Sequence, residues 1–160
     1  MRKLLKVSSV LATTAGVIMV AGGVWGIMFT HNTVAREKII TPEDAEIAGQ
    51  PVRGPLTLMA QANVIRDHTL KTTGGKTYAE MPRQIAKLDT DGKPVFDASG
   101  NAVMVPNGAR DMWITATALT TALNLGIVTY AFSGLMVLLG LISIWTGITF
   151  NALSKKVIAN

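Results

Sequence analysis

The sequence contains two histidines, His31 and His68, which are the side chains best suited to bind a transition metal. A non-haem iron site needs two imidazoles and one carboxylate around the metal, with open positions for substrate and oxygen. Both histidines would have to converge on one metal from positions 37 residues apart, and no imidazole would remain for acid–base work. We therefore expect His31 to be a membrane-interface residue and His68 to be a hydrogen-bonding residue at a surface or interface.

The segment that begins Asp89-Thr90-Asp91-Gly92 resembles the start of a calcium-binding loop. A calcium loop of this type needs an oxygen ligand at its fifth position and a bidentate Glu at its twelfth, and here these positions hold Lys93 and Gly100. Asp and Gly in this order are also typical of tight turns. The sequence therefore predicts a turn here.

The run Gly74-Gly75-Lys76-Thr77 resembles the end of a phosphate-binding loop. That motif needs another glycine five residues before the final Gly-Lys-Thr, and the position is occupied by Leu70. No serine stands in a recognisable nucleophile motif beside a histidine and an acid. We predict no catalytic residue, no cofactor and no metal site, and we do not expect an enzyme.

The charges are distributed very unevenly along the 160 residues, of which 49% are hydrophobic and 16% charged. Residues 31–111 hold ten Lys or Arg and ten Asp or Glu, so the net charge of +5 comes from the two ends. A neutral central segment offers no basic face for nucleic acid. There is no cysteine, which excludes disulfides and thiol chemistry.

Residues 7–30 form a stretch of 24 uncharged residues that follows Arg2, Lys3 and Lys6. A helix of this length crosses a hydrocarbon core of about 30 Å with some tilt. A secretory signal peptide has the same basic start, but its apolar region usually runs only about 7–15 residues. We expect residues 7–30 to be an uncleaved first transmembrane helix.

Residues 112–154 are also uncharged and are too long for a single span. One long helix and two short spans with a turn near Asn124 and Gly126 are both compatible with the composition. Cations cluster on the cytoplasmic side of short flanking segments, so the basic first residues and the pair Lys155 and Lys156 favour two cytoplasmic ends. An even number of spans then predicts a membrane-proximal helix at 112–124, one transmembrane helix at 125–150, and cytoplasmic ends at 1–6 and 151–160.

The fold class expected is a mainly α membrane protein in which two transmembrane helices flank a small extracytoplasmic α+β loop domain at 31–111. Within this loop we expect a helix beginning at Thr41, a helix from Pro55 to about Thr72, and a capping box at Thr77 and Glu80. Turn signals on both sides of Phe96 predict a small hairpin or meander at 89–107, and no internal repeat is expected.

Small residues in the first span recur at steps of four, as Ser8, Ala12 and Gly16 and again as Gly22 and Gly26. Such spacing lets another helix approach closely, although glycine and alanine are also common in membrane helices in general. We predict a helix-packing interface that uses Gly16, Gly22 and Gly26, together with Gly134 of the second span.

The sequence AGQPVRGP from residue 48, AQANVI from residue 60, His68, and TGGKTYAE from residue 73 form an ordered block. This block resembles that of a group of small two-span actinobacterial membrane proteins with the pattern AGxPVxGP…QAxVIxxH…TGGKTYAE, often labelled aromatic-ring-opening dioxygenases. The two-span plan is similar to that of accessory subunits of the actinobacterial respiratory supercomplex of cytochrome bc-type reductase and terminal oxidase.

The resemblance implies a non-catalytic accessory subunit that stabilises or bridges integral membrane subunits in an electron-transport complex. Its loop would contact the partners through residues of the block: Gly54, Pro55, Gln61, His68, Gly74, Gly75, Lys76, Tyr78 and Glu80. A free-standing envelope protein that binds a lipid or cell-wall component is the alternative. A metal-dependent dioxygenase is the third hypothesis. The expected partners are membrane subunits and lipids, and the expected location is the plasma membrane.

Overall fold

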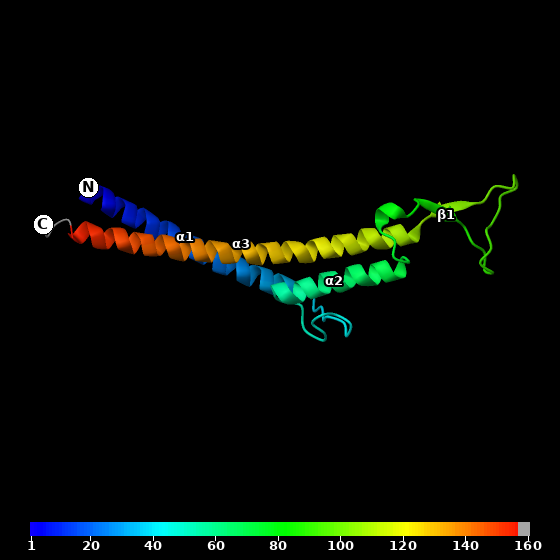
Figure 1. Ribbon diagram of the computed structural model, residues 1–160, viewed down its shortest axis with the longest axis horizontal. Helices are drawn as coiled ribbons and strands as arrows, with labels where there is room; N and C mark the ends of the chain where they lie inside the picture. Colours follow the sequence, from blue (N-terminus) through cyan, green and yellow to red (C-terminus); the bar gives the residue numbers. More distant parts are fainter. Residues whose placement is uncertain (157–160) are drawn as a thin grey trace. The chain divides into compact units, whose positions relative to one another are not determined.

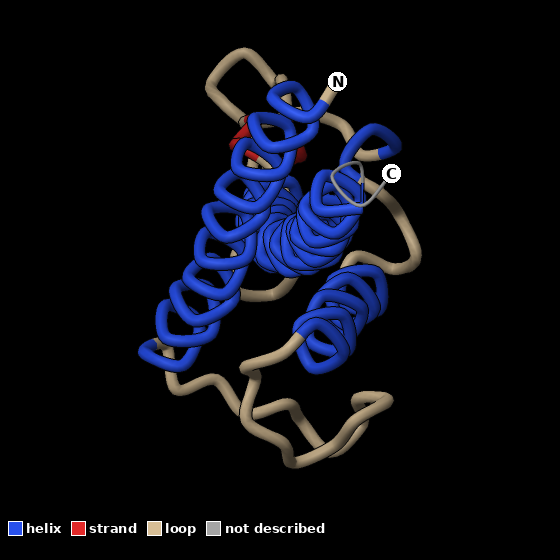
Figure 2. The backbone as a smooth tube through the Cα atoms, turned by 90° about the vertical axis from the view of Figure 1, so that its left-hand side faces the viewer, coloured by secondary structure: helices blue, strands red, loops and turns tan. Residues whose placement is uncertain are grey.

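The computed structural model describes residues 1–156, and most of this chain is helical (Figures 1 and 2). The three α-helices are α1 (Arg2–Arg36), α2 (Pro55–Thr72) and α3 (Gly108–Lys156). A short 3₁₀ helix, η1 (Tyr78–Glu80), and two strands, β1 (Gln84–Ala86) and β2 (Met104–Pro106), complete the elements. Helices α1 and α3 are both long and apolar enough to cross a membrane.

The chain divides into two compact units. The first, the helix-pair unit, contains Met1–Ile40, Gln50–Leu58 and the chain from Leu125 onward. The second, the polar unit, contains Thr41–Gly49 and Met59–Asn124. The helix-pair unit holds residues 7–30 of α1 and 125–154 of α3, which are uncharged, whereas the polar unit holds residues 112–124 of α3 and most of the charged residues.

The long uncharged segment near the C-terminus belongs to a single helix. Helix α3 has 49 residues and continues without a break through Asn124 and Gly126, so the alternative of two short spans with a turn at these residues is wrong. Neither an Asn nor a Gly needs to end a helix whose backbone hydrogen bonds are otherwise complete, because each costs at most about 1 kcal/mol relative to Ala.

Helix α2 begins at Pro55 and ends at Thr72, as the sequence predicts. The helix predicted to begin at Thr41 is absent, because this segment closes into a loop instead. The hydroxyl of Thr41 donates to the carbonyl of Ile47, and the Thr41 carbonyl accepts from the N–H of Gly49 at 3.0 Å. The Thr41 side chain therefore bridges the loop and does not cap a helix.

Residues 84–106 form an irregular antiparallel structure in which β1 pairs with β2. Three backbone bonds close a cycle at its centre: Lys87 N–H donates to Val103 at 2.7 Å, Val103 to Val95 at 2.8 Å, and Val95 to Lys87 at 2.8 Å. The prediction of a small hairpin or meander is confirmed in this form, and we call the segment the three-way junction.

The three-way junction contains an eight-residue repeat, so the expectation of no internal repeat is wrong. Residues 88–95 and 96–103 read LDTDGKPV and FDASGNAV. In each copy one Asp Oδ1 accepts two backbone N–H bonds, Asp89 at 2.8 and 2.9 Å and Asp97 at 2.8 and 2.9 Å. In each copy the glycine has a positive φ, 76° at Gly92 and 82° at Gly100, which glycine adopts without steric cost.

Candidate functional site

Helices α1 and α3 pack antiparallel along a seam of small residues within the helix-pair unit. The buried residues of α1 are Ser9, Gly16, Gly23 and Thr30, which are spaced seven residues apart. On α3 the buried positions of the same unit also follow a spacing of seven: Ser133, Gly140, Gly147 and Ser154. A strict seven-residue repeat keeps one face of each helix directed at its partner, as in left-handed helix pairs.

The backbones touch directly at the glycines of this seam. A Cβ atom added at Gly16 would lie 2.6 Å from the carbonyl oxygen of Gly140, and one added at Gly140 would lie 2.8 Å from that of Gly16. A Cβ added at Gly23 would lie 2.6 Å from the carbonyl oxygen of Ser133. These positions have no room for a methyl group, so glycine sets the distance between the helices.

Two serine hydroxyls form hydrogen bonds between the helices, near the ends that the sequence predicts to be cytoplasmic. Ser9 Oγ donates to the Gly147 carbonyl at 2.7 Å, and Ser143 Oγ donates to the Ala12 carbonyl at 2.8 Å. Interhelical bonds of this kind in membranes contribute about 0.6 kcal/mol each on average. Close packing and hydrogen bonding therefore act on the same seam.

The glycines predicted to form a packing interface divide into two groups. Gly16 lies in the seam, and Gly22 and Gly26 also face α3, where added Cβ atoms would meet the Met136 Cε at 3.4 Å and the Ser133 hydroxyl. Nothing lies within 4 Å of an added Cβ at Gly134. The neighbouring helix predicted for the first three is therefore supplied by this same chain, whereas Gly134 is left open.

The four-residue spacing in the first span identified only part of the seam. It found Gly16, but it selected Ser8 in place of Ser9 and did not include Gly23 or Thr30. The equal spacing of Ser133, Gly140 and Gly147 was also overlooked. A search for small residues at steps of seven in both apolar segments finds all of these positions.

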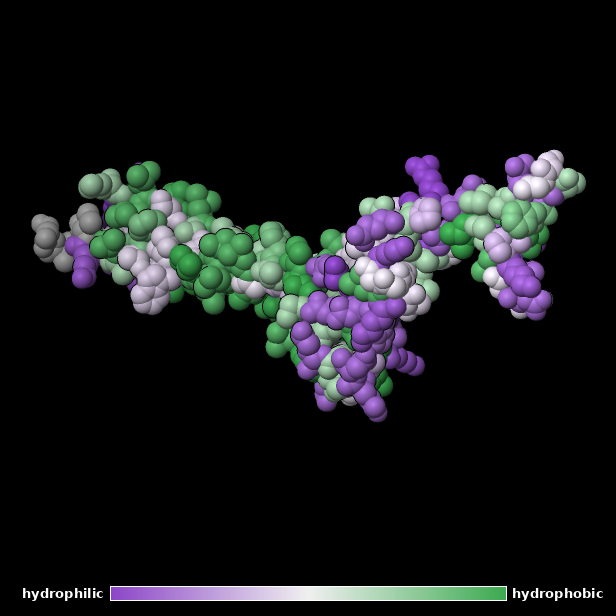
Figure 3. Space-filling model, turned by 45° about the vertical axis from the view of Figure 1, so that its right-hand side comes forward, coloured by the Kyte–Doolittle hydropathy of each residue, from purple (hydrophilic) through white to green (hydrophobic). Residues whose placement is uncertain are grey.

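The outward faces of the helix pair carry large apolar side chains. Trp25 is 67% exposed, Phe132 61% and Trp145 72%. Figure 3 shows mostly hydrophobic side chains over the surface of the long helices where they pair, and most of the hydrophilic side chains over the rest of the chain. Trp25 also stacks on Phe29 with ring centroids 5.3 Å apart. An apolar surface this extensive is suited to lipid or to other membrane helices.

In the polar unit, the TGGKTYAE block ends α2 and anchors the chain on α3. The left-handed Gly74 and Gly75 (φ 63° and 77°) stop the helix, and the Gly75 N–H donates to the Leu70 carbonyl at 2.7 Å. The indole N–H of Trp113, which is buried in α3, reaches the Lys76 carbonyl at 2.9 Å and the Thr73 hydroxyl at 3.2 Å. Lys76 thus contributes its backbone to this anchor.

Tyr78 and Glu80 of the same block are also engaged within the polar unit. The Arg110 guanidinium lies 3.9 Å from the centre of the Tyr78 ring and donates to the Met81 carbonyl at 2.7 Å. The predicted capping box is confirmed: the backbone N–H and the hydroxyl of Thr77 each donate to Glu80 Oε2 at 2.7 Å. These bonds hold the pKa of the Glu80 carboxyl below its ordinary value of 4.5.

The remaining block residues have separate roles. Gly54 and Pro55 form the start of α2, where the Gly54 carbonyl accepts from Leu58 N–H at 2.9 Å. The buried Oε1 of Gln61 has no hydrogen-bond partner among the residues described. His68 Nε2 lies 2.7 Å from Asp44 Oδ2, a hydrogen bond that lowers the pKa of the Asp44 carboxyl. The block therefore supplies helix ends, a cap and a hydrogen bond to Asp44.

The two histidines lie in different hydrogen-bonding environments. Residues 1–156 contain no group of three or more His, Cys, Asp or Glu side chains that could hold a metal ion. His68 is paired with Asp44, and the buried Nε2 of His31 has no hydrogen-bond partner in this part of the chain. A non-haem iron site needs three such ligands around one point.

Comparison with protein families, with characterised proteins and with solved structures finds no match to this chain.

Proposed function

We propose that the chain is a membrane hairpin with spans at residues 7–30 and 125–150, both ends in the cytoplasm and residues 31–111 outside. The contacts Ser9–Gly147, Gly16–Gly140 and Gly23–Ser133 share one antiparallel register, which lays residues 7–30 of α1 beside about 126–149 of α3. Two uncharged segments, each long enough to cross a bilayer, thus lie side by side with their ends aligned. The cations at both ends favour the cytoplasmic side.

We propose further that the hairpin is a non-catalytic accessory subunit of a larger membrane complex. The observation that carries this proposal is the seam itself. Helices α1 and α3 pack on each other through glycines and hydrogen-bonding serines, so the pair is complete within this chain and its outward faces are apolar. At Gly134 an added Cβ would meet no atom within 4 Å, so a partner helix can approach the backbone of α3 there. The similarity of the two-span plan to that of accessory subunits of the actinobacterial respiratory supercomplex supports that assembly as the complex.

Affinity purification of the full-length chain from its native membrane in mild detergent tests this role. We expect large integral membrane subunits in fixed stoichiometry with the tagged chain. Gly134→Leu should reduce this recovery while leaving the α1–α3 pair intact, because position 134 has free space within its own chain. Recovery of the chain alone would contradict the accessory role and favour a free-standing envelope protein.

A further inference from the structure

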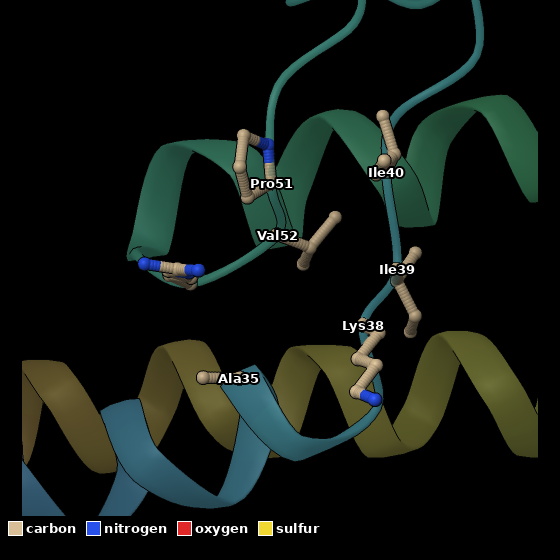
Figure 4. Close-up of a pocket in the computed structure, with 7 residues that line it drawn as sticks. Ala35, Lys38, Ile39, Ile40, Pro51 and Val52 are labelled. Atoms are coloured by element: carbon tan, nitrogen blue, oxygen red, sulfur yellow. The ribbon is translucent and has the colours of Figure 1, made fainter.

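A small pocket lies just beyond the end of α1, within the helix-pair unit. It has a volume of about 180 Å³ and is lined by two chain segments, Lys38–Ile40 and Pro51–Arg53, together with Ala35 of the last turn of α1. Figure 4 shows these segments side by side, with Ala35 below them. Its walls combine apolar side chains with two cations, Lys38 and Arg53.

The backbone around the pocket is held in place by hydrogen bonds and by one unusual conformation. Lys38 has a left-handed φ of 52°, which is uncommon for a residue other than glycine and turns the chain back after α1. The N–H of Val52 then donates to the Ile39 carbonyl at 2.9 Å, and Ile40 forms a β-bridge with Pro51. Val52 is 1% exposed, so it closes the floor of this turn.

Arg53 has a fixed backbone and a guanidinium without a carboxylate partner. Its N–H donates to the Thr57 hydroxyl at 3.0 Å, and its carbonyl accepts from the Tyr130 hydroxyl at 2.5 Å. Within residues 1–156 neither Lys38 nor Arg53 forms a salt bridge. The pocket therefore presents two unneutralised cations on a fixed backbone.

The position of the pocket beyond the end of α1 places the two cations near the level of the lipid phosphates. The stacked pair Trp25 and Phe29 lies near the end of the uncharged stretch, and such aromatic rings settle at headgroup level. From Phe29 to the end of α1 is about 10 Å at 1.5 Å per residue, which brings Lys38 and Arg53 within snorkelling reach of the lipid phosphates.

We propose that this pocket binds the phosphate of an anionic phospholipid in the outer leaflet. The guanidinium of Arg53 can donate two parallel hydrogen bonds to phosphate oxygens, and Lys38 adds a point charge. Ile39, Ile40 and Pro51 provide apolar contacts for the part of the lipid below the phosphate. The proposal rests on the membrane insertion proposed above.

The test uses the full-length chain in dodecylmaltoside micelles and native mass spectrometry, with phosphatidylglycerol and phosphatidylcholine as probes. The double variant Lys38→Gln/Arg53→Gln is compared with Arg83→Gln/Lys87→Gln, which loses the same charge outside the pocket. At roughly 1 kcal/mol per basic residue near a lipid surface, we expect phosphatidylglycerol to bind the pocket variant about thirty-fold more weakly and the control as the wild type does. Arg53→Gln alone, which should give about a five-fold loss, serves if the double variant does not fold.

Equal phosphatidylglycerol binding by the pocket and control variants would overturn the inference, and so would equal binding of phosphatidylglycerol and phosphatidylcholine. Displacement of the lipid by millimolar inorganic phosphate would also overturn it, because free phosphate would then be the ligand. Alkaline carbonate extraction of native membranes separates this test from that of the proposed function. Release of the chain by carbonate would contradict membrane insertion. Retention of the chain without a preference for phosphatidylglycerol would contradict the pocket alone.

Discussion

At the scale of single residues, the glycines of the long helices differ in what surrounds their Cα atoms. Gly23 faces the Ser133 carbonyl so closely that a methyl group has no room, whereas Gly134 faces open space. The same substitution should therefore have opposite effects at the two positions. This contrast gives a test of the seam that does not depend on any partner.

Gly23→Ala is expected to destabilise the α1–α3 pair by about 1–3 kcal/mol, the usual range for an overpacked interior. Gly134→Ala should be neutral or stabilising by up to about 1 kcal/mol, because alanine favours helix where nothing obstructs it. A pair of dyes, attached to one chain that carries both Lys3→Cys and Leu153→Cys, would report the separation of α1 and α3 in each alanine variant during titration with sodium dodecyl sulphate. Equal stability of the two alanine variants would contradict the seam.

A second residue-scale prediction concerns Glu80. Its pKa is lowered by hydrogen bonds from the Thr77 backbone and then from the Thr77 hydroxyl. A lowered folded-state pKa contributes stability that is present above the ordinary value of 4.5 and is lost as the pH falls through the folded value. The capping box should therefore open in acid. Thr77→Val removes the hydroxyl but keeps the backbone N–H donor, so it should raise the Glu80 pKa part of the way towards 4.5. NMR titration of the Glu80 carboxyl measures its pKa in the wild type and in Thr77→Val. An unchanged pKa in Thr77→Val would contradict a role for the hydroxyl.

At the scale of elements, the end of α2 is held by the indole of Trp113. Trp113→Phe removes the donor to the Lys76 carbonyl and the Thr73 hydroxyl from a buried site, which we expect to cost about 1–3 kcal/mol. Amide hydrogen exchange at residues 73–80 should become faster. Trp145→Phe, at a 72% exposed position, is the matched control and should leave these amides unchanged. Equal exchange in both variants would show that the anchor does not depend on the indole.

The elements also show which sequence signals were sufficient. Pro55 and Gly74-Gly75 are strong local signals, and α2 begins and ends where they predict. Thr41-Pro42 is an equally good local signal for a helix. The Thr41 hydroxyl, however, donates to the Ile47 carbonyl across the 41–49 loop, a contact that no local pattern shows. The repeat in the three-way junction was visible in the letters, whereas its cyclic hydrogen bonds, which join residues up to 16 positions apart, were not.

At the scale of the whole molecule, composition was the most informative property of the sequence. Two uncharged segments predicted the two long apolar helices, and both are present. The functional role of individual residues was harder to predict, because a glycine that packs against its own chain and one that faces open space have the same local sequence. Gly16 and Gly134 differ only in what the antiparallel register places beside them.

The topology of the chain is tested most directly by thiol labelling, because the sequence has no cysteine of its own. Single variants Asn101→Cys and Lys3→Cys would be treated with a membrane-impermeant maleimide in intact cells and again after the cells are opened. We expect the thiol of Asn101→Cys to react in intact cells and that of Lys3→Cys to react only after opening. Reaction of Lys3→Cys in intact cells, or protection of Asn101→Cys there, would contradict the two-span hairpin with cytoplasmic ends.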